Sequence, residues 1–203
     1  MKLHVTLDES LCAHLMECLL AQGDALLAAL QAAGCERKTE GWVQQGLSTW
    51  LAIRAPDLVC LTEYLDIDFA VLRRDSIGQD RLVVDTMIEA KFNYTSQTAE
   101  LVNRPGRAAE QLDGYLKTHP GADGYLLYLL ADHAPRPRST VLADRGWRYL
   151  RQLEEGRFET GVALMQASAR RAGLVSKGLA AGLLAGWRLH LEVFAPQSQA
   201  SGP

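Results

Sequence analysis

An unbroken apolar run in the second half of the chain constrains the fold more than any other feature. Residues 124–130 contain four leucines and two tyrosines and no charged side chain. A strand that is buried on both faces reads as a continuous apolar run, because neither of its faces meets water. Such a strand belongs inside a sheet covered by helices on both sides, so the run favours an α/β protein.

The segments before this run predict further strands and one connecting helix. Residues 63–72 and 82–92 are rich in branched and aromatic residues, and the polar stretch 73–80 between them predicts a hairpin loop. The short apolar run 58–61 either stands alone or continues into 63–72. Residues 93–105 are interpreted as a loop with room for a short helix, and 107–118 as a helix. A strand, a helix and a strand in this order predict a parallel pair.

Helices are predicted at both ends of this central part. Residues 8–34 show helical spacing of leucines with a break at Gly23-Asp24, and a further helix is expected from Thr39, its predicted cap, to Ile53. Helical patterns also cover 143–155 and 157–172, a last strand is expected at 187–194, and 197–203 is expected to be disordered. The chain is therefore predicted to form one domain over 1–196, with a helical extension at 1–38, an αβββαβ core at 39–131, and a helical extension with the last strand at 132–196.

Composition narrows the class of protein. The 203 residues are 48% hydrophobic, with no apolar stretch long enough to span a bilayer and no signal-peptide pattern at the N-terminus, which favours a cytoplasmic protein without a membrane partner. The four cysteines match no zinc or redox spacing and are expected to be free thiols. Charge is uneven: residues 1–100 hold 8 Lys and Arg against 15 Asp and Glu, and 101–203 hold 13 against 9.

Acidic and basic residues at the ends of two predicted strands suggest a metal-dependent site. Glu89 and Lys91 are two apart and so share one face of their strand, as do Asp66 and Asp68 on the preceding strand. Charges at the end of an apolar strand are costly to bury without compensation. A divalent cation would compensate the carboxylates, and Mg²⁺ or Mn²⁺ suits such oxygen ligands. The alternative is an ordinary Glu-Lys pair at an exposed strand end.

This arrangement resembles the PD-(D/E)XK nucleases, the restriction-endonuclease-like superfamily. The resemblance covers residues 39–131: an acid on one strand, Glu89-Ala90-Lys91 on the next, then a helix and an apolar strand. It implies a mixed central sheet flanked by helices, with Asp68 and Glu89 as metal ligands and Lys91 assisting the attacking water. Family members place the acid where Asp68 stands, although Asp66 remains an alternative.

Three further residues gain a role from the same resemblance. An acid on the first core helix reaches the metal in many members, and Glu40 is the candidate; it could equally be a partner of the helix dipole. The RecB-like exonucleases carry Gln and Tyr four residues apart, as Gln111 and Tyr115 are here. The alternative is an amphipathic helix with a half-buried tyrosine. The iron–sulfur cysteines of some RecB-like members are absent.

Arginines in the second half provide a candidate nucleic-acid surface. A polyanion would fit between them and a metal site in the first half, although solvated arginines on a helix face explain the pattern as well. The five are Arg136, Arg138, Arg145, Arg148 and Arg151.

The sequence thus predicts a deoxyribonuclease in which Mg²⁺-activated water attacks a phosphodiester of DNA, either as a homodimer or with a recognition subunit. One alternative is a catalytically silent subunit of the same fold that binds DNA or protein. Another is a partner-controlled effector of a defence or toxin-like complex.

Overall fold

The computed structural model describes residues 7–23, 36–64, 67–73, 83–95, 97–133 and 157–197, the side chains of 36–44, 63–64, 133 and 157 excepted. These residues form an α/β structure with one six-stranded mixed sheet and four helices. No helix among them is both long enough and apolar enough to cross a membrane.

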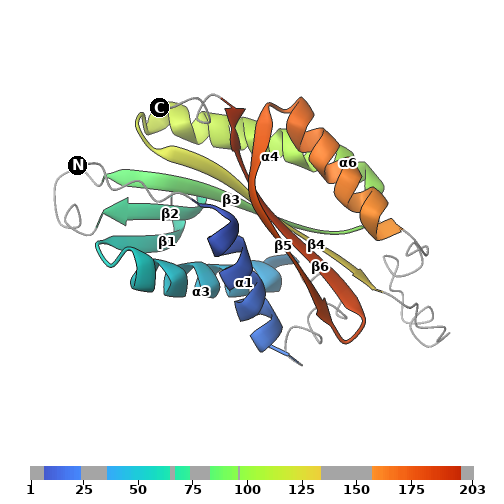
Figure 1. Cartoon of the computed structure of the whole chain (residues 1–203). Coiled ribbons are helices and arrows are strands. Elements are labelled where there is room, and N and C mark those ends of the chain that lie inside the picture. Colours follow the sequence, from blue (N-terminus) through green and yellow to red (C-terminus); the bar gives the residue numbers. More distant parts are fainter. Residues whose placement is uncertain are drawn as a thin grey trace.

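The six strands follow the order β1-β2-β3-β4-β6-β5 across the sheet (Figure 1). Only β3 and β4 are parallel, and all other neighbours are antiparallel. The bounds are β1 Leu58–Tyr64, β2 Ile67–Arg73, β3 Val84–Tyr94, β4 Asp123–His133, β5 Leu174–Leu184 and β6 Trp187–Pro196.

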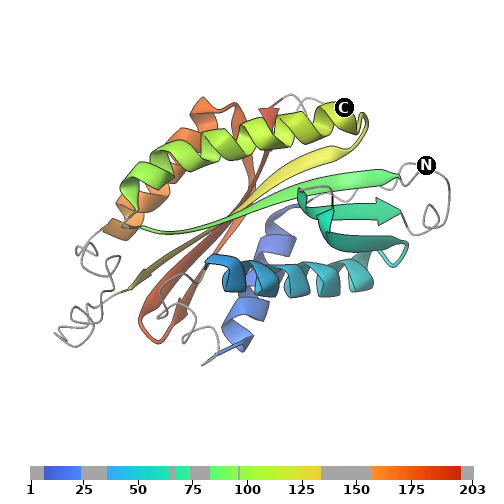
Figure 2. The same ribbon diagram turned by 180° about the vertical axis from the view of Figure 1, so that it is seen from behind.

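Helices cover both faces of the sheet. Helices α1 (Glu9–Ala21) and α3 (Glu36–Arg54) pack on one face, where Leu15 and Leu47 join the largest apolar cluster. Helices α4 (Thr98–Thr118) and α6 (Arg157–Arg171) cover the opposite face, where Leu101 and Met165 meet Tyr128 of β4. Figure 2 shows the two layers from behind. Because β4 is covered on both sides, its continuous apolar run is explained.

The predicted parallel pair and the order of the core elements are confirmed. Helix α4 connects β3 to β4, and Ile88 pairs with Tyr125 in parallel register. From α3 to β4 the elements follow the predicted αβββαβ order. The hairpin expected around 73–80 is confirmed as an antiparallel pairing of β2 with β3, although 74–82 lie outside the described residues.

Two predicted boundaries in this core are wrong. Helix α4 begins at Thr98, so most of the expected loop 93–105 is helix, and Pro105 lies inside it. A proline costs a helix one hydrogen bond, but Pro105 and Leu101 are both buried on its apolar side, and this burial offsets the loss. Helix α3 begins at Glu36, which places Thr39 within the helix rather than at its cap.

The runs 58–61 and 63–72 belong to two strands and do not form a continuous one. Strand β1 ends at Tyr64, β2 begins at Ile67, and the two pair antiparallel with Thr62 opposite Phe69. Both are rich in apolar residues, so composition alone gave no sign of the reversal between them.

Strand β5 was not predicted from the sequence, because small residues weaken its pattern. Those small residues make room for α1: a Cβ on Gly178 would lie 2.3 Å from the backbone nitrogen of Glu9, and one on Gly182 would lie 2.6 Å from Met16. Ala185 and Gly186, both with positive φ, form the two-residue turn into β6. The predicted last strand, 187–194, is confirmed as β6.

The terminal predictions are confirmed only in part. Helix α1 confirms the first half of the predicted 8–34 segment, and Asp8 caps it by accepting a hydrogen bond from the backbone N–H of Ser10 at 2.9 Å. Helix α6 confirms the predicted helix at 157–172. Residues 24–35, the predicted helix at 143–155 and residues 198–203 lie outside the described part of the chain.

Candidate active site

Strands β2 and β3 bring Asp68, Glu89 and Lys91 together on one face of the sheet. Phe69 pairs with Ile88, so Asp68 and Glu89 lie one step further along these antiparallel strands. Because side chains alternate along a strand, both carboxylates and Lys91 share the face of Ala70 and Met87, which α4 covers. The grouping expected from the sequence is therefore present in the structure.

Direct contacts connect the three side chains. Asp68 Oδ2 accepts a hydrogen bond from the backbone N–H of Ala90 at 2.8 Å. Lys91 Nζ lies 3.5 Å from the same oxygen and forms an ion pair and hydrogen bond with Glu89 Oε1. The lysine thus lies between two carboxylates that come from different strands.

The carboxylates of Asp68 and Glu89 differ in how deeply they are buried. Glu89 is 2% exposed, whereas the side chain of Asp68 is 32% exposed. Burial, countered in part by Lys91 and reinforced by the negative charge of Asp68, raises the pKa of Glu89 to about 7. The second oxygen of Glu89, Oε2, is buried and has no hydrogen-bond partner among the described residues. A buried carboxylate oxygen without a donor is costly to ionise, and a positively charged partner would offset that cost.

A divalent cation fits this donor set. Asp68 offers a half-exposed carboxylate and Glu89 a buried one with an unused oxygen, and Mg²⁺ commonly keeps several waters while binding one or two carboxylates. Within the described part of the chain no three His, Cys, Asp or Glu side chains group into a metal site. Glu40 lies on α3, but its side chain is outside the described set, and Asp66 lies outside the described residues altogether.

Helix α4 carries the other two predicted site residues over the same face of the sheet. Tyr115 is half-buried and packs against the cluster that contains Ile67 and Ala70, the neighbours of Asp68 on β2. Gln111 lies one turn earlier on α4 and is exposed. Tyr115 therefore packs on the face of the sheet that carries the site, and Gln111 is exposed to solvent.

A buried polar group next to the site was not predicted from the sequence. Lys91 is in register with Tyr128 of β4, and the Tyr128 hydroxyl and the Asn93 side-chain amide are 2.5 Å apart. Arg104 of α4 donates to the backbone carbonyl of Phe92 at 3.1 Å. Asn93 follows Glu89 and Lys91 at the same two-residue spacing, and this spacing is the signal that would have found it.

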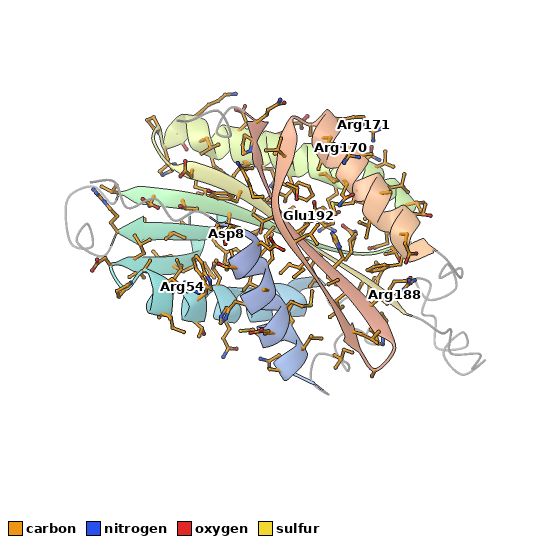
Figure 3. The ribbon with its side chains drawn as sticks, in the orientation of Figure 1. Asp8, Arg54, Arg170, Arg171, Arg188 and Glu192 are labelled. Carbon is orange, nitrogen blue, oxygen red and sulfur yellow. The ribbon has the colours of Figure 1, made fainter. Side chains whose placement is uncertain are left out.

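A second buried polar group lies further across the same face. Glu192 of β6, labelled in Figure 3, is in register with Tyr128. Its Oε2 is 2.8 Å from His190 Nε2 and 2.9 Å from Gln166 Nε2. Burial raises the pKa of Glu192, but hydrogen bonds from His190, Ser176 and Gln166 outweigh it and hold that pKa below its ordinary value. Because these partners satisfy Glu192, it differs from Glu89, whose buried Oε2 meets no donor in the described part of the chain. None of these residues was among the site residues predicted from the sequence.

The remaining predicted residues have the following positions. The five arginines of the candidate nucleic-acid surface lie within 134–156, outside the described residues. Cys12, Cys18 and Cys60 are free thiols, as expected, and Cys35 is outside the described residues. Comparison of the chain with models of protein families, with curated proteins and with solved structures finds no match.

Proposed function

We propose that this protein is a metal-dependent nuclease that hydrolyses phosphodiester bonds in DNA, built on a restriction-endonuclease-like fold. The observation that carries the proposal is the convergence of Asp68, Glu89 and Lys91 from two strands, where one buried oxygen of Glu89 meets no donor from the described residues. The αβββαβ order and the parallel step through α4 support the fold assignment.

Each of the three residues has a task that follows from its environment. The partly exposed Asp68 and the buried Glu89 would together hold Mg²⁺ or Mn²⁺. When bound, such an ion lowers the pKa of a water and neutralises charge on the phosphate. Lys91 places a fixed cation beside both carboxylates, where it orients the attacking water and stabilises the charge that develops on the phosphate oxygens.

The site also sets a pH condition for metal binding. A carboxylate must lose its proton before it can bind a cation, and Glu89 loses its proton near pH 7. Lys91 compensates the ionised Glu89 in the protein without metal. Cation binding and cleavage should therefore both increase as the pH rises through about 7.

One observation favours a second candidate, a catalytically silent subunit of the same fold that binds DNA or a protein partner. Among the described side chains only two carboxylates meet at the site, and no third ligand joins them. Such a subunit would bind DNA without cutting it, either alone or under the control of a partner.

Cleavage assays distinguish the two candidates. Supercoiled, linear and single-stranded DNA would be incubated with Mg²⁺, Mn²⁺ or EDTA and with wild type, Lys91→Ala or Lys117→Ala. Lys117 is the matched control, since it is a lysine exposed on α4 that forms a solvated ion pair with Asp113. Metal-dependent cleavage that Lys91→Ala abolishes and Lys117→Ala retains supports the nuclease. DNA binding without cleavage under every condition supports the silent subunit.

A further inference from the structure

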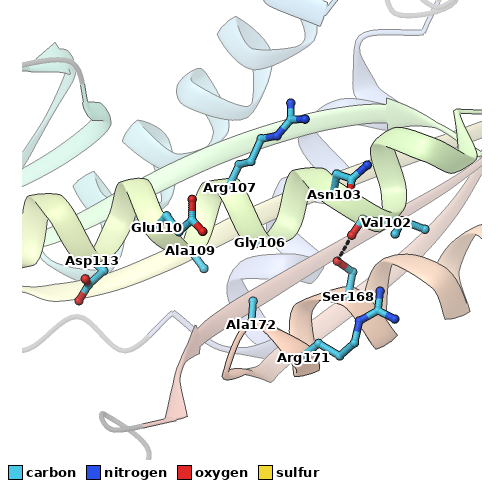
Figure 4. Close-up of a pocket in the computed structure, with 10 residues that line it drawn as sticks. All are labelled: Val102, Asn103, Gly106, Arg107, Ala109, Glu110, Asp113, Ser168, Arg171 and Ala172. Atoms are coloured by element: carbon cyan, nitrogen blue, oxygen red, sulfur yellow. Dashed lines mark hydrogen bonds between the residues drawn. The ribbon is translucent and has the colours of Figure 1, made fainter.

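One side of α4 carries a row of polar side chains, and one of them, Arg107, also lies at the edge of the groove between α4 and α6. Arg104, Arg107, Gln111 and Tyr115 are spaced three, four and four residues apart and therefore share one side of the helix. The other flank faces α6, where Ser168 Oγ donates to the carbonyl of Val102 at 2.6 Å. An open groove of about 580 Å³ lies between these two helices (Figure 4).

Two contacts set the position of α4 along the parallel strands β3 and β4. Near its N-terminal end, Arg104 donates to the carbonyl of Phe92. Near its C-terminal end, Leu112 and Leu116 pack over Gly124, whose Cβ position lies 2.8 to 3.1 Å from their side-chain atoms, and Gly124 is in register with Met87. The helix therefore runs antiparallel to β3 from the level of Phe92 to that of Met87.

Glu89 and Lys91 lie between these two levels, beneath the middle of the row. A helix rises about 1.5 Å and a strand about 3.3 Å per residue, so Arg107 and Gln111 lie roughly 5 Å and 10 Å beyond Arg104 along α4, and Lys91 and Glu89 lie roughly 3 Å and 10 Å beyond Phe92 along β3. Arg107 thus falls near the level of Lys91, and Gln111 near that of Glu89.

Arg107 is the one arginine of the row whose guanidinium is available to a ligand. It is exposed and forms no hydrogen bond or ion pair with any other residue that the structure describes, whereas Arg104 is held on the backbone of β3. Figure 4 shows Arg107 pointing away from α6 and Ser168. The guanidinium group binds phosphate oxygens through two parallel N–H donors.

We propose that Arg107 binds a backbone phosphate of the DNA strand next to the scissile phosphate. This inference rests on the proposed nuclease function. With a divalent cation bound, the two carboxylates and Lys91 leave the site only weakly positive, so a DNA strand that extends beyond the scissile phosphate gains from a further cation. Arg107 supplies that cation at the level of the site, and it acts in binding rather than in the chemical step.

Binding measurements with a matched control test this role. Fluorescence anisotropy of labelled single-stranded and duplex oligonucleotides would be recorded with Mg²⁺ at several salt concentrations. The Lys91→Ala background prevents cleavage during the measurement. Arg107→Ala, Arg107→Lys and Arg171→Ala would be compared, because Arg171 is an equally exposed arginine on α6, across the groove.

The expected result is a specific loss of affinity. Arg107→Ala binds about tenfold more weakly, and the slope of log K against log salt becomes shallower by about one. Arg107→Lys restores part of the affinity, and Arg171→Ala binds like the background. In the cleavage-competent protein, Arg107→Ala raises KM and leaves kcat within a few-fold.

Other outcomes separate this inference from the function on which it rests. Equal affinity and an equal salt slope for Arg107→Ala overturn the role of Arg107, as does an equal loss for Arg171→Ala. If Lys91→Ala abolishes cleavage while Arg107→Ala changes nothing, the nuclease stands and only this inference falls. If the wild type neither binds nor cuts DNA, both fall.

Discussion

Asp68 accepts a hydrogen bond from the backbone N–H of Ala90, the residue between Glu89 and Lys91, at 2.8 Å. This bond fixes the carboxylate of one strand against the tripeptide of the next. It explains how β2 and β3 hold their charged side chains at a defined separation, with Lys91 Nζ 3.5 Å from the same oxygen. The contact therefore has a structural part, the hydrogen bond, and an electrostatic part, the charge.

Asp68→Asn separates these two parts. The amide oxygen of asparagine still accepts from Ala90, so the free energy of unfolding should change by no more than about 1 kcal/mol. The negative charge is lost, so the pKa of Glu89, which Asp68 raises, should fall. Carboxyl-carbon NMR titration would measure that pKa.

Cleavage by Asp68→Asn should drop at least about 100-fold. An unchanged pKa of Glu89 would contradict the geometry, and unchanged cleavage would remove Asp68 from the site.

Glu89→Gln should stabilise the protein at alkaline pH. The ordinary pKa of this carboxyl is 4.5 and burial raises it to about 7, so between these values the folded protein retains a proton that the unfolded chain has released. Stability therefore falls as the pH rises through this window, and the full cost is present above about 7. Glutamine removes the cost, roughly 3 kcal/mol at pH 8 and close to zero at pH 4.

Urea unfolding at both pH values would measure this difference. Glu110→Gln is the control, because it makes the same chemical change at an exposed position on α4. Equal effects of Glu89→Gln at pH 4 and pH 8 would mean that Glu89 titrates near its ordinary value.

Mg²⁺ should stabilise the wild type in a pH-dependent way. A ligand that binds only the folded state raises Tm, and protons compete with the cation for Glu89 below about pH 7. We expect Tm to rise by a few degrees with millimolar Mg²⁺ at pH 8 and to change little at pH 5.5. Calorimetry with NaCl at matched ionic strength provides the control. A rise of the same size in Asp68→Asn would place the cation elsewhere on the protein.

Gly161→Ala should destabilise the protein because α6 packs directly on the residue that follows β3. A Cβ on Gly161 would lie 2.9 Å from both the Cβ and the Cγ2 of Thr95, a β-branched side chain with little freedom to move. The expected loss is about 1–3 kcal/mol. Gly106→Ala in α4 is the matched control, because no atom of the described residues lies within 4 Å of the Cβ position there. This variant should stabilise the protein by up to about 1 kcal/mol. Thermal unfolding of the two variants would show shifts of opposite sign. Equal shifts would contradict the close packing of α6 on Thr95.

The sequence by itself determined the elements with a strong period and the grouping of the charged residues along them. The apolar run of β4, the strand with Glu89 and Lys91 and the parallel step through α4 were all predicted, because burial on two faces and two-residue alternation leave a direct trace in residue order. The same alternation is sufficient to place Glu89 and Lys91 on one face of their strand.

Only the tertiary structure decided which residues those charges meet and how deeply they are buried. The hydrogen bond from Ala90 to Asp68 joins residues 22 positions apart, and the register that creates it depends on the antiparallel pairing of β2 with β3. Strand β5 and the helical position of Pro105 were missed for the same reason: packing against α1 and against the sheet outweighed weak local preferences. The raised pKa of Glu89 is likewise a consequence of the helix layer that covers the sheet, which residue order alone does not contain.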